Sequence, residues 1–117
     1  SGRMEGTALN VPVPHGSLLD LTMVLRDTET SIEMINNLME KKAKEHKNII
    51  EVVYDPIVST DIIGNRHSVV FDKQSVMKSP GRMIKVLSWY HTSLCVAARV
   101  VDVIIAYNKI DKKGGSQ

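Results

Sequence analysis

The sequence has one cysteine, one tryptophan and one phenylalanine among its 117 residues. A single cysteine excludes an intrachain disulfide and is typical of a reducing compartment, so we expect the cytoplasm. No apolar run reaches the length of about 18 residues that a membrane-spanning helix needs, so no membrane partner is predicted. The formal charge of +2 is small and spread along the chain, which argues against nucleic acid as a partner.

Two patterns that carry cofactor chemistry are also missing. The four histidines and the cysteine are scattered along the chain, so the sequence predicts no metal site. No glycine-rich loop follows a predicted strand, so these residues are not expected to form a dinucleotide-binding fold.

The length is that of one domain, which we assign to residues 1–117. The polar composition of residues 111–117 predicts a flexible tail. The chain opens with Ser1-Gly-Arg and not with methionine, so we expect it to be a piece of something longer.

Hydrophobic periodicity predicts five strands and two helices. The clearest strand signal is the alternation in residues 18–25, and Thr30 with Glu33 has the form of a helix capping box. The predicted strands are residues 7–13, 18–25, 48–54, 67–71 and 82–90, and the fourth could extend to residue 77. The first predicted helix covers residues 31–46, and the second begins at Ser93.

This order, β-β-α-β-β-β-α, predicts an α+β fold with an antiparallel or mixed sheet and both helices on one face. Two helices cannot cover both faces of such a sheet. The second face would carry Leu18, Val24 and Trp89, and would need a partner. We therefore expect homo-oligomerisation through this face or docking of a missing segment.

Individual reactive side chains have structural explanations. Cys95 could be an activated thiol at a helix start, but its apolar neighbours favour a small buried residue. His67 ends an ordered loop, where a structural hydrogen bond to the loop backbone is expected. The aspartates of the central segment could form an acid–base set, but aspartates beside proline and loop residues more often cap turns: Asp55, Asp61 and Asp72.

The central segment, Asp55-Pro-Ile-Val-Ser-Thr-Asp-Ile-Ile-Gly-Asn-Arg-His-Ser-Val-Val-Phe-Asp72, closely resembles part of phosphorylating glyceraldehyde-3-phosphate dehydrogenase. Other blocks resemble the same family in order and spacing: Ala8-Leu-Asn-Val-Pro-Val-Pro14, residues 17–25, Ile84-Lys-Val-Leu-Ser-Trp-Tyr90 and Arg99-Val-Val-Asp102. The resemblance covers nearly the whole chain and implies the C-terminal part of that enzyme's catalytic domain. It also implies that the cofactor-binding half, the catalytic cysteine and the base histidine precede the first residue here.

The resemblance places functional residues at three positions, and all three differ here. Asn10 stands where the family has a phosphate-binding arginine. Thr92 stands where a family asparagine meets the nicotinamide of NAD, and Val96 where a family tyrosine packs. No residue here matches the family's nucleophile or base, so we expect this chain alone to bind no cofactor.

Two functions from different classes follow. The first is a fragment or degenerate relative of the NAD-dependent glycolytic dehydrogenase, catalytically incompetent as given. The alternative is a non-catalytic interaction or assembly module that reuses the fold.

Overall fold

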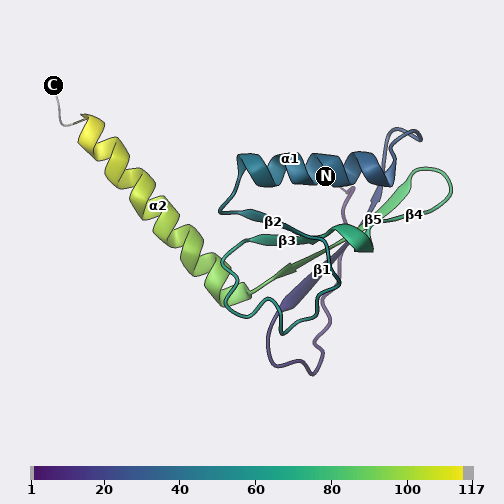
Figure 1. The fold of residues 1–117 in the computed structure, drawn as a ribbon, viewed down its shortest axis with the longest axis horizontal. Coiled ribbons are helices and arrows are strands. Elements are labelled where there is room, and N and C mark those ends of the chain that lie inside the picture. The colour runs from purple at the N-terminus through teal and green to yellow at the C-terminus, as the bar shows by residue number, and fades with distance from the viewer. Residues whose placement is uncertain (1, 115–117) are drawn as a thin grey trace.

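The computed structural model describes residues 2–114, which form a mixed sheet and two helices (Figure 1). The elements follow in the order β1 (Ser17–Val24), α1 (Ile32–Glu45), β2 (Ile50–Val53), β3 (Val69–Asp72), a short 3-10 turn (Lys73–Ser75), β4 (Met77–Lys78), β5 (Met83–Tyr90) and α2 (Thr92–Gly114). The predicted α+β class and the five-stranded sheet are confirmed.

Strand β5 is the centre of the sheet. The strand order is β1-β5-β3-β2, and β4 also pairs with β5. β5 is antiparallel to β1, β3 and β4, whereas β2 and β3 are parallel. The longest pairing joins β1 to β5 over their full lengths, from Ser17 opposite Tyr90 to Val24 opposite Met83.

Helix α1 begins one residue later than the capping box predicts. The Ser31 hydroxyl accepts a hydrogen bond from the Met34 amide at 3.1 Å, so Ser31 is the N-cap. Thr30 instead donates its hydroxyl to Asp27 at 3.3 Å. Competition from the Asp27 carboxylate therefore moves the cap by one position.

The core lies between α1 and the sheet. Its fully buried members come from β3, β5 and the segment between them: Phe71, Val76, Ile84 and Val86. Ile35 and Met39 of α1 pack against this cluster, together with aliphatic side chains of β1 and β2. Apolar burial of this kind is the main stabilising contribution, at roughly 1.5–3 kcal/mol for each large side chain.

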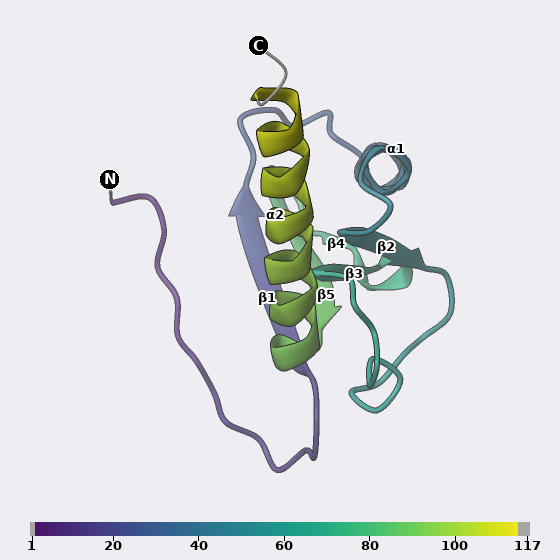
Figure 2. The ribbon, with the colours of Figure 1, turned by 90° about the vertical axis from the view of Figure 1, so that its left-hand side faces the viewer.

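The loop of residues 54–68 lies on the opposite side of β2 and β3 from α1 (Figures 1 and 2). Ile62 in this loop is only 1% exposed. The Asp61 carboxylate accepts from the Val58 amide at 2.7 Å and fixes the loop's first turn. The central segment therefore covers part of the second sheet face, where the sequence predicts no covering element.

Residues 7–13 do not form the predicted strand. Their apolar alternation is real, but no strand of the described part of the chain pairs with them. Pro12 and Pro14 also lack the amide hydrogens that a ladder needs. The amide of Val13 instead donates to the carbonyl of Val11 at 2.8 Å.

The predicted extension of the fourth strand to Met77 is interrupted. The Asp72 carboxylate accepts from the amides of Gln74 and Ser75, at 3.0 and 3.2 Å, and closes the 3-10 turn. The chain then resumes as β4, a separate short strand on β5.

Helix α2 leaves the sheet instead of packing on the same face as α1 (Figures 1 and 2). Every residue from Val100 to Lys112 is exposed. α2 also continues through Gly114, so residues 111–114 are helical and not part of the predicted flexible tail. The rest of that tail, residues 115–117, lies outside the described residues.

Gly16 is a position where only glycine fits. Its φ is +89°, and an added Cβ would lie 2.9 Å from the carbonyl oxygen of Ser59. We predict that Gly16→Ala lowers the free energy of unfolding by about 2 kcal/mol or more, because strain and a backbone clash add together. Gly64→Ala is the matched control, since Gly64 has a φ of +82° but open space around it. Urea unfolding should show a clearly smaller loss for Gly64→Ala, and equal losses would contradict the clash.

The ion pair between Glu40 and Lys73 gives a pH-dependent prediction. The hydrogen bond from Lys73 holds the pKa of Glu40 below its ordinary value, and the same bond raises the pKa of Lys73. Because the pKa of Glu40 is depressed in the folded state, its contribution is present at neutral pH and is lost as the pH falls through that pKa. Glu40→Gln should therefore be less stable than the parent near neutral pH, and the difference should be smaller at about pH 3. Urea unfolding at both pH values checks this, and a difference of the same size in acid would contradict it.

Candidate functional site

The junction between β5 and α2 carries two of the three positions that the resemblance singles out. Thr92 is the first residue of α2, and its hydroxyl oxygen lies 3.1 Å from that of Ser17 at the start of β1. The His91 ring nitrogen Nδ1 accepts from the Leu94 amide at 3.3 Å and satisfies one free amide of the first helical turn. The side chains of His91 and Thr92 thus hold the helix start to the sheet.

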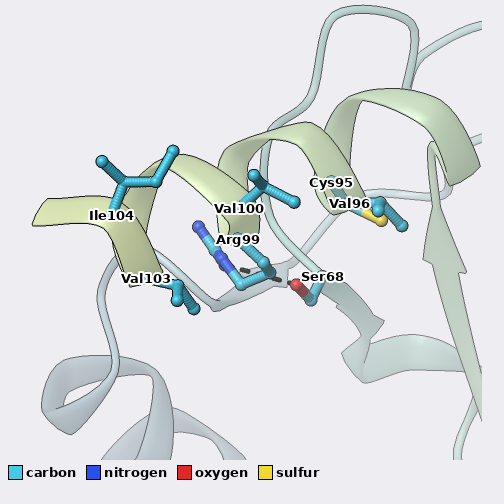
Figure 3. Close-up of a pocket in the computed structure, with 7 residues that line it drawn as sticks. All are labelled: Ser68, Cys95, Val96, Arg99, Val100, Val103 and Ile104. Carbon is cyan, nitrogen blue, oxygen red and sulfur yellow. Dashed lines mark hydrogen bonds between the residues drawn. The ribbon is translucent and has the colours of Figure 1, made fainter. Parts of the chain in front are cut away.

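Val96 lies one turn further along, in an apolar groove of about 350 Å³ beside α2. Figure 3 shows valine and isoleucine side chains along the helix, with Arg99 and Ser68 at the inner edge. The lining residues are Ser68, Cys95, Val96, Arg99, Val100, Val103 and Ile104. A groove of this lining can take apolar side chains and offers few groups that could orient a polar ligand.

Arg99 joins α2 to the strands. Its guanidinium donates to the carbonyl of Asn48 at 2.7 Å. It also donates to the hydroxyl of Ser68 at 3.2 Å (Figure 3). It also pairs with Asp102 at 2.9 Å. Because these three contacts engage both terminal nitrogens, Arg99 has a structural role and is not presented for binding an anion.

Cys95 is buried, at 7% exposure, and its thiol donates to the carbonyl of Thr92 at 3.6 Å. The prediction of a small buried residue is confirmed. His67 also has a structural role, but its ring bonds to a loop side chain and to the carbonyl of a residue before β2, and not to the loop backbone as expected. Its ring nitrogens lie 2.8 Å from the side-chain oxygen of Asn65 and 3.0 Å from the carbonyl of Lys47. Both side chains stabilise local structure.

The remaining predicted positions do not gather into a site. Asn10 is exposed in residues 7–13, and no hydrogen bond within residues 2–114 joins it to Thr92 or Val96. Asp61 and Asp72 each cap their own turn, as the turn-capping interpretation expects. Among the described residues, no group of three possible metal ligands comes together. None of the helices in the described range is long and apolar enough to cross a membrane.

Sequence reasoning missed two features of this junction. The first is the role of Arg99 in joining α2 to residues 48 and 68, because the sequence shows one arginine in α2 but not which residues it contacts. The second is the stacking of His15 on His91, whose ring centroids lie 6.1 Å apart. Nothing in the local pattern of either histidine indicates that contact.

The structural role of Arg99, whose guanidinium bonds to Asn48 and Ser68 and which we call the clamp, is testable. Arg99→Met removes the donors to Asn48 and Ser68 while keeping a long apolar stem, and we predict a loss of about 1–3 kcal/mol in unfolding free energy. Lys109→Met is the control, because Lys109 is exposed on the projecting part of α2. Thermal unfolding of both variants should lower the midpoint for Arg99→Met alone, and an unchanged midpoint would argue against the clamp.

Comparison with known proteins agrees with these observations. Residues 1–92 match the family model described as glyceraldehyde 3-phosphate dehydrogenase, C-terminal domain, and the match ends where α2 begins. The chain is 40% identical over 104 residues to glyceraldehyde-3-phosphate dehydrogenase of Borreliella burgdorferi, which covers 87% of this chain and 31% of that protein.

Two further relatives agree. Glyceraldehyde-3-phosphate dehydrogenase 2 of Bacillus subtilis is 38% identical, over 88% of this chain and 30% of its own length. Glyceraldehyde-3-phosphate dehydrogenase of Glossina morsitans morsitans is 33% identical, over 89% of this chain and 31% of its own length. The chain thus spans about a third of the length of these relatives. With the family model matching most of its residues, the chain belongs to the glyceraldehyde-3-phosphate dehydrogenase family and carries its C-terminal domain.

Proposed function

We propose that these 117 residues are a scaffold and assembly part of a dehydrogenase relative and do not by themselves bind NAD or oxidise an aldehyde. One observation carries the proposal. All three positions that the family resemblance assigns to ligands are changed. Thr92 bonds to Ser17, and Val96 lines an apolar groove.

The change at Asn10 removes the cation that a phosphate group needs. Arginine binds phosphate through two parallel charged hydrogen bonds, whereas an asparagine amide is neutral and offers one NH₂ group. Arg99 does not replace it, because its guanidinium is bound to Asn48, Ser68 and Asp102. A phosphorylated aldehyde would therefore lose its main point of attachment.

The residues present do not fit the nicotinamide end of NAD either. A carboxamide offers both a donor and an acceptor, which an asparagine side chain can match with its own amide, whereas Thr92 offers a single hydroxyl that also pairs with Ser17. The buried Cys95 thiol faces the Thr92 carbonyl, so it is not placed as a nucleophile. We derive no catalytic step from this set of side chains.

A partner polypeptide is part of the proposal. α2 exposes aliphatic side chains on several sides, including Val100, Val103, Ile104 and Ile110. A helix this apolar is normally covered by another part of a protein. In this proposal, the exposed aliphatic surface of α2 packs against the cofactor-binding half of a dehydrogenase. Homo-oligomerisation through the sheet face with Leu18 and Val24, which are 43% and 67% exposed, is the second possibility.

The alternative function is an interaction module that reuses the fold. The same exposed α2 surface favours it, since that surface needs a partner whether or not the partner brings catalytic residues. We also propose a cytoplasmic setting, because the lone cysteine is free and the family's reaction belongs to glycolysis.

The prediction is that calorimetric titration of NAD into this protein gives no saturable heat, with any affinity weaker than about 1 mM. An intact dehydrogenase of the family serves as the positive control. Binding in the micromolar range would contradict the proposal.

The natural sequence upstream of Ser1 separates the two functions. A Ser-Cys-Thr-Thr-Asn block followed by a histidine would support a part of a complete dehydrogenase, and unrelated sequence would support the interaction module.

A further inference from the structure

The imidazole ring of His67 faces hydrogen-bond acceptors on both of its nitrogens. Its Nδ1 atom lies 2.8 Å from the side-chain oxygen of Asn65 and 3.2 Å from a carboxylate oxygen of Glu51. Its Nε2 atom lies 3.0 Å from the main-chain carbonyl oxygen of Lys47. An amide oxygen or an ionised carboxylate can only accept, so each nitrogen needs a proton to make these bonds. A neutral imidazole carries one such proton, and the doubly protonated ring carries both.

The orientation of the Asn65 amide is fixed by two further contacts. Its oxygen accepts from the main-chain amide of His67 at 2.9 Å, and its NH₂ group donates to the Glu51 carboxylate. Turning this amide over would set its NH₂ group against the main-chain N–H of His67. Turning the imidazole over would set carbon atoms against the acceptors. Both alternatives lose hydrogen bonds, so the doubly protonated ring is the form that satisfies its surroundings.

The charges around the ring favour the same form. Glu51 of β2 supplies a carboxylate in direct contact with the ring. The Lys47 carbonyl lies just past the end of α1, where the helix dipole stabilises a nearby cation. The ring also borders a groove of about 310 Å³ between α1 and β2, whose other charged or titratable lining residues are Glu40, Lys44, Lys47, Glu51 and Tyr54. The two lysines oppose a further positive charge, but within residues 2–114 the ring's ion pair is with Glu51.

The ring joins two segments that also hold α2. Lys47 belongs to the connection between α1 and β2, and His67 ends the loop that covers part of the second sheet face. Beside this contact, the Arg99 guanidinium bonds to the carbonyl of Asn48 and to the hydroxyl of Ser68. The residues concerned are neighbours in both segments. A change in the bond between the ring and Lys47 therefore acts on the attachment of α2.

We propose that His67 is a pH-sensitive switch: with both ring nitrogens protonated it bonds to Asn65 and Lys47 together, and it loses its bond to one of them when the second proton leaves. The proton passes to water, and a ring lone pair then faces an oxygen lone pair. His67 is not one of the three positions that the family resemblance singles out. The switch therefore does not depend on the absence of NAD binding.

The change is confined to one end of the sheet. The main-chain bonds from Ser68 and Val69 to the Ile49 carbonyl, at 2.9 and 3.0 Å, do not need the ring proton. The strands therefore stay paired when the ring loses a bond. What loosens are the two segments to which Arg99 bonds, so α2 becomes less firmly attached as the pH rises.

Urea unfolding at two pH values tests the switch with His67→Gln, whose side chain never gains a charge. In the proposal the folded protein holds the second ring proton more tightly than the unfolded chain does. That proton therefore stabilises the fold at low pH, and the stabilisation is lost as the pH rises. We expect the ratio of unfolding constants, variant over parent, to be roughly fivefold or more larger at about pH 5.5 than at about pH 8.5.

His46→Gln is the matched control, since His46 is exposed and its ring makes no hydrogen bond within the part of the chain that the structure describes. Its ratio should change much less between the two pH values. A ratio for His67→Gln that is the same at both pH values would overturn the proposal, as would an equal change for the two variants.

Nitrogen NMR of the parent protein gives a readout for which no variant has to fold. Both ring nitrogens of folded His67 should keep their protons to a higher pH than the histidines of the same protein unfolded in urea. Loss at the same pH would overturn the proposal. Amide hydrogen exchange tests the link to α2. After correction for the intrinsic rate, protection in the first turns of α2 should fall several-fold between the two pH values, and constant protection would overturn that link.

Discussion

The main-chain pairing of β5 is the interaction on which the rest of the structure depends. β5 holds β1, β3 and β4 directly, and β2 reaches the sheet only through β3. Its core-facing residues Ile84 and Val86 meet Phe71 and Val76 under α1. Its last residues lead through His91 into α2. One strand therefore sets the register of the sheet, the position of the core and the direction in which α2 leaves.

The β5–α2 junction holds two of the positions on which the proposed loss of catalysis rests. Thr92 and Val96 occupy places that the family resemblance assigns to the nicotinamide pocket. Here the hydroxyl of Thr92 holds the start of β1, and Val96 extends the apolar surface of α2. Val96 has no polar group and the Thr92 hydroxyl pairs with Ser17, and both observations support the proposed loss of catalysis.

The sequence correctly predicts those elements that have both a regular hydrophobic period and another element of the chain to pair with. Residues 18–25 and 82–90 were assigned to strands almost at their true bounds because each supplies half of one ladder. Residues 7–13 have an equally regular period, but period two cannot show whether a partner strand exists. Likewise, the aliphatic residues of α2 predict a covered helix, and only the structure shows that nothing within the described residues covers its outer part.

The site was less predictable than the fold. The structural roles of Cys95 and His67 followed from their neighbours in sequence. The clamp of Arg99 to Asn48 and Ser68 joins residues more than 30 positions apart, and no local pattern encodes such a contact.

The exposed length of α2 has a consequence for how the protein's folding free energy is defined. An isolated helix of this size is marginal in water, and from Val100 onward α2 has no support from the sheet. Anything that binds the folded form stabilises it by mass action, in proportion to the logarithm of its free concentration. The melting temperature of this protein would therefore rise with the concentration of any molecule that binds the exposed part of α2.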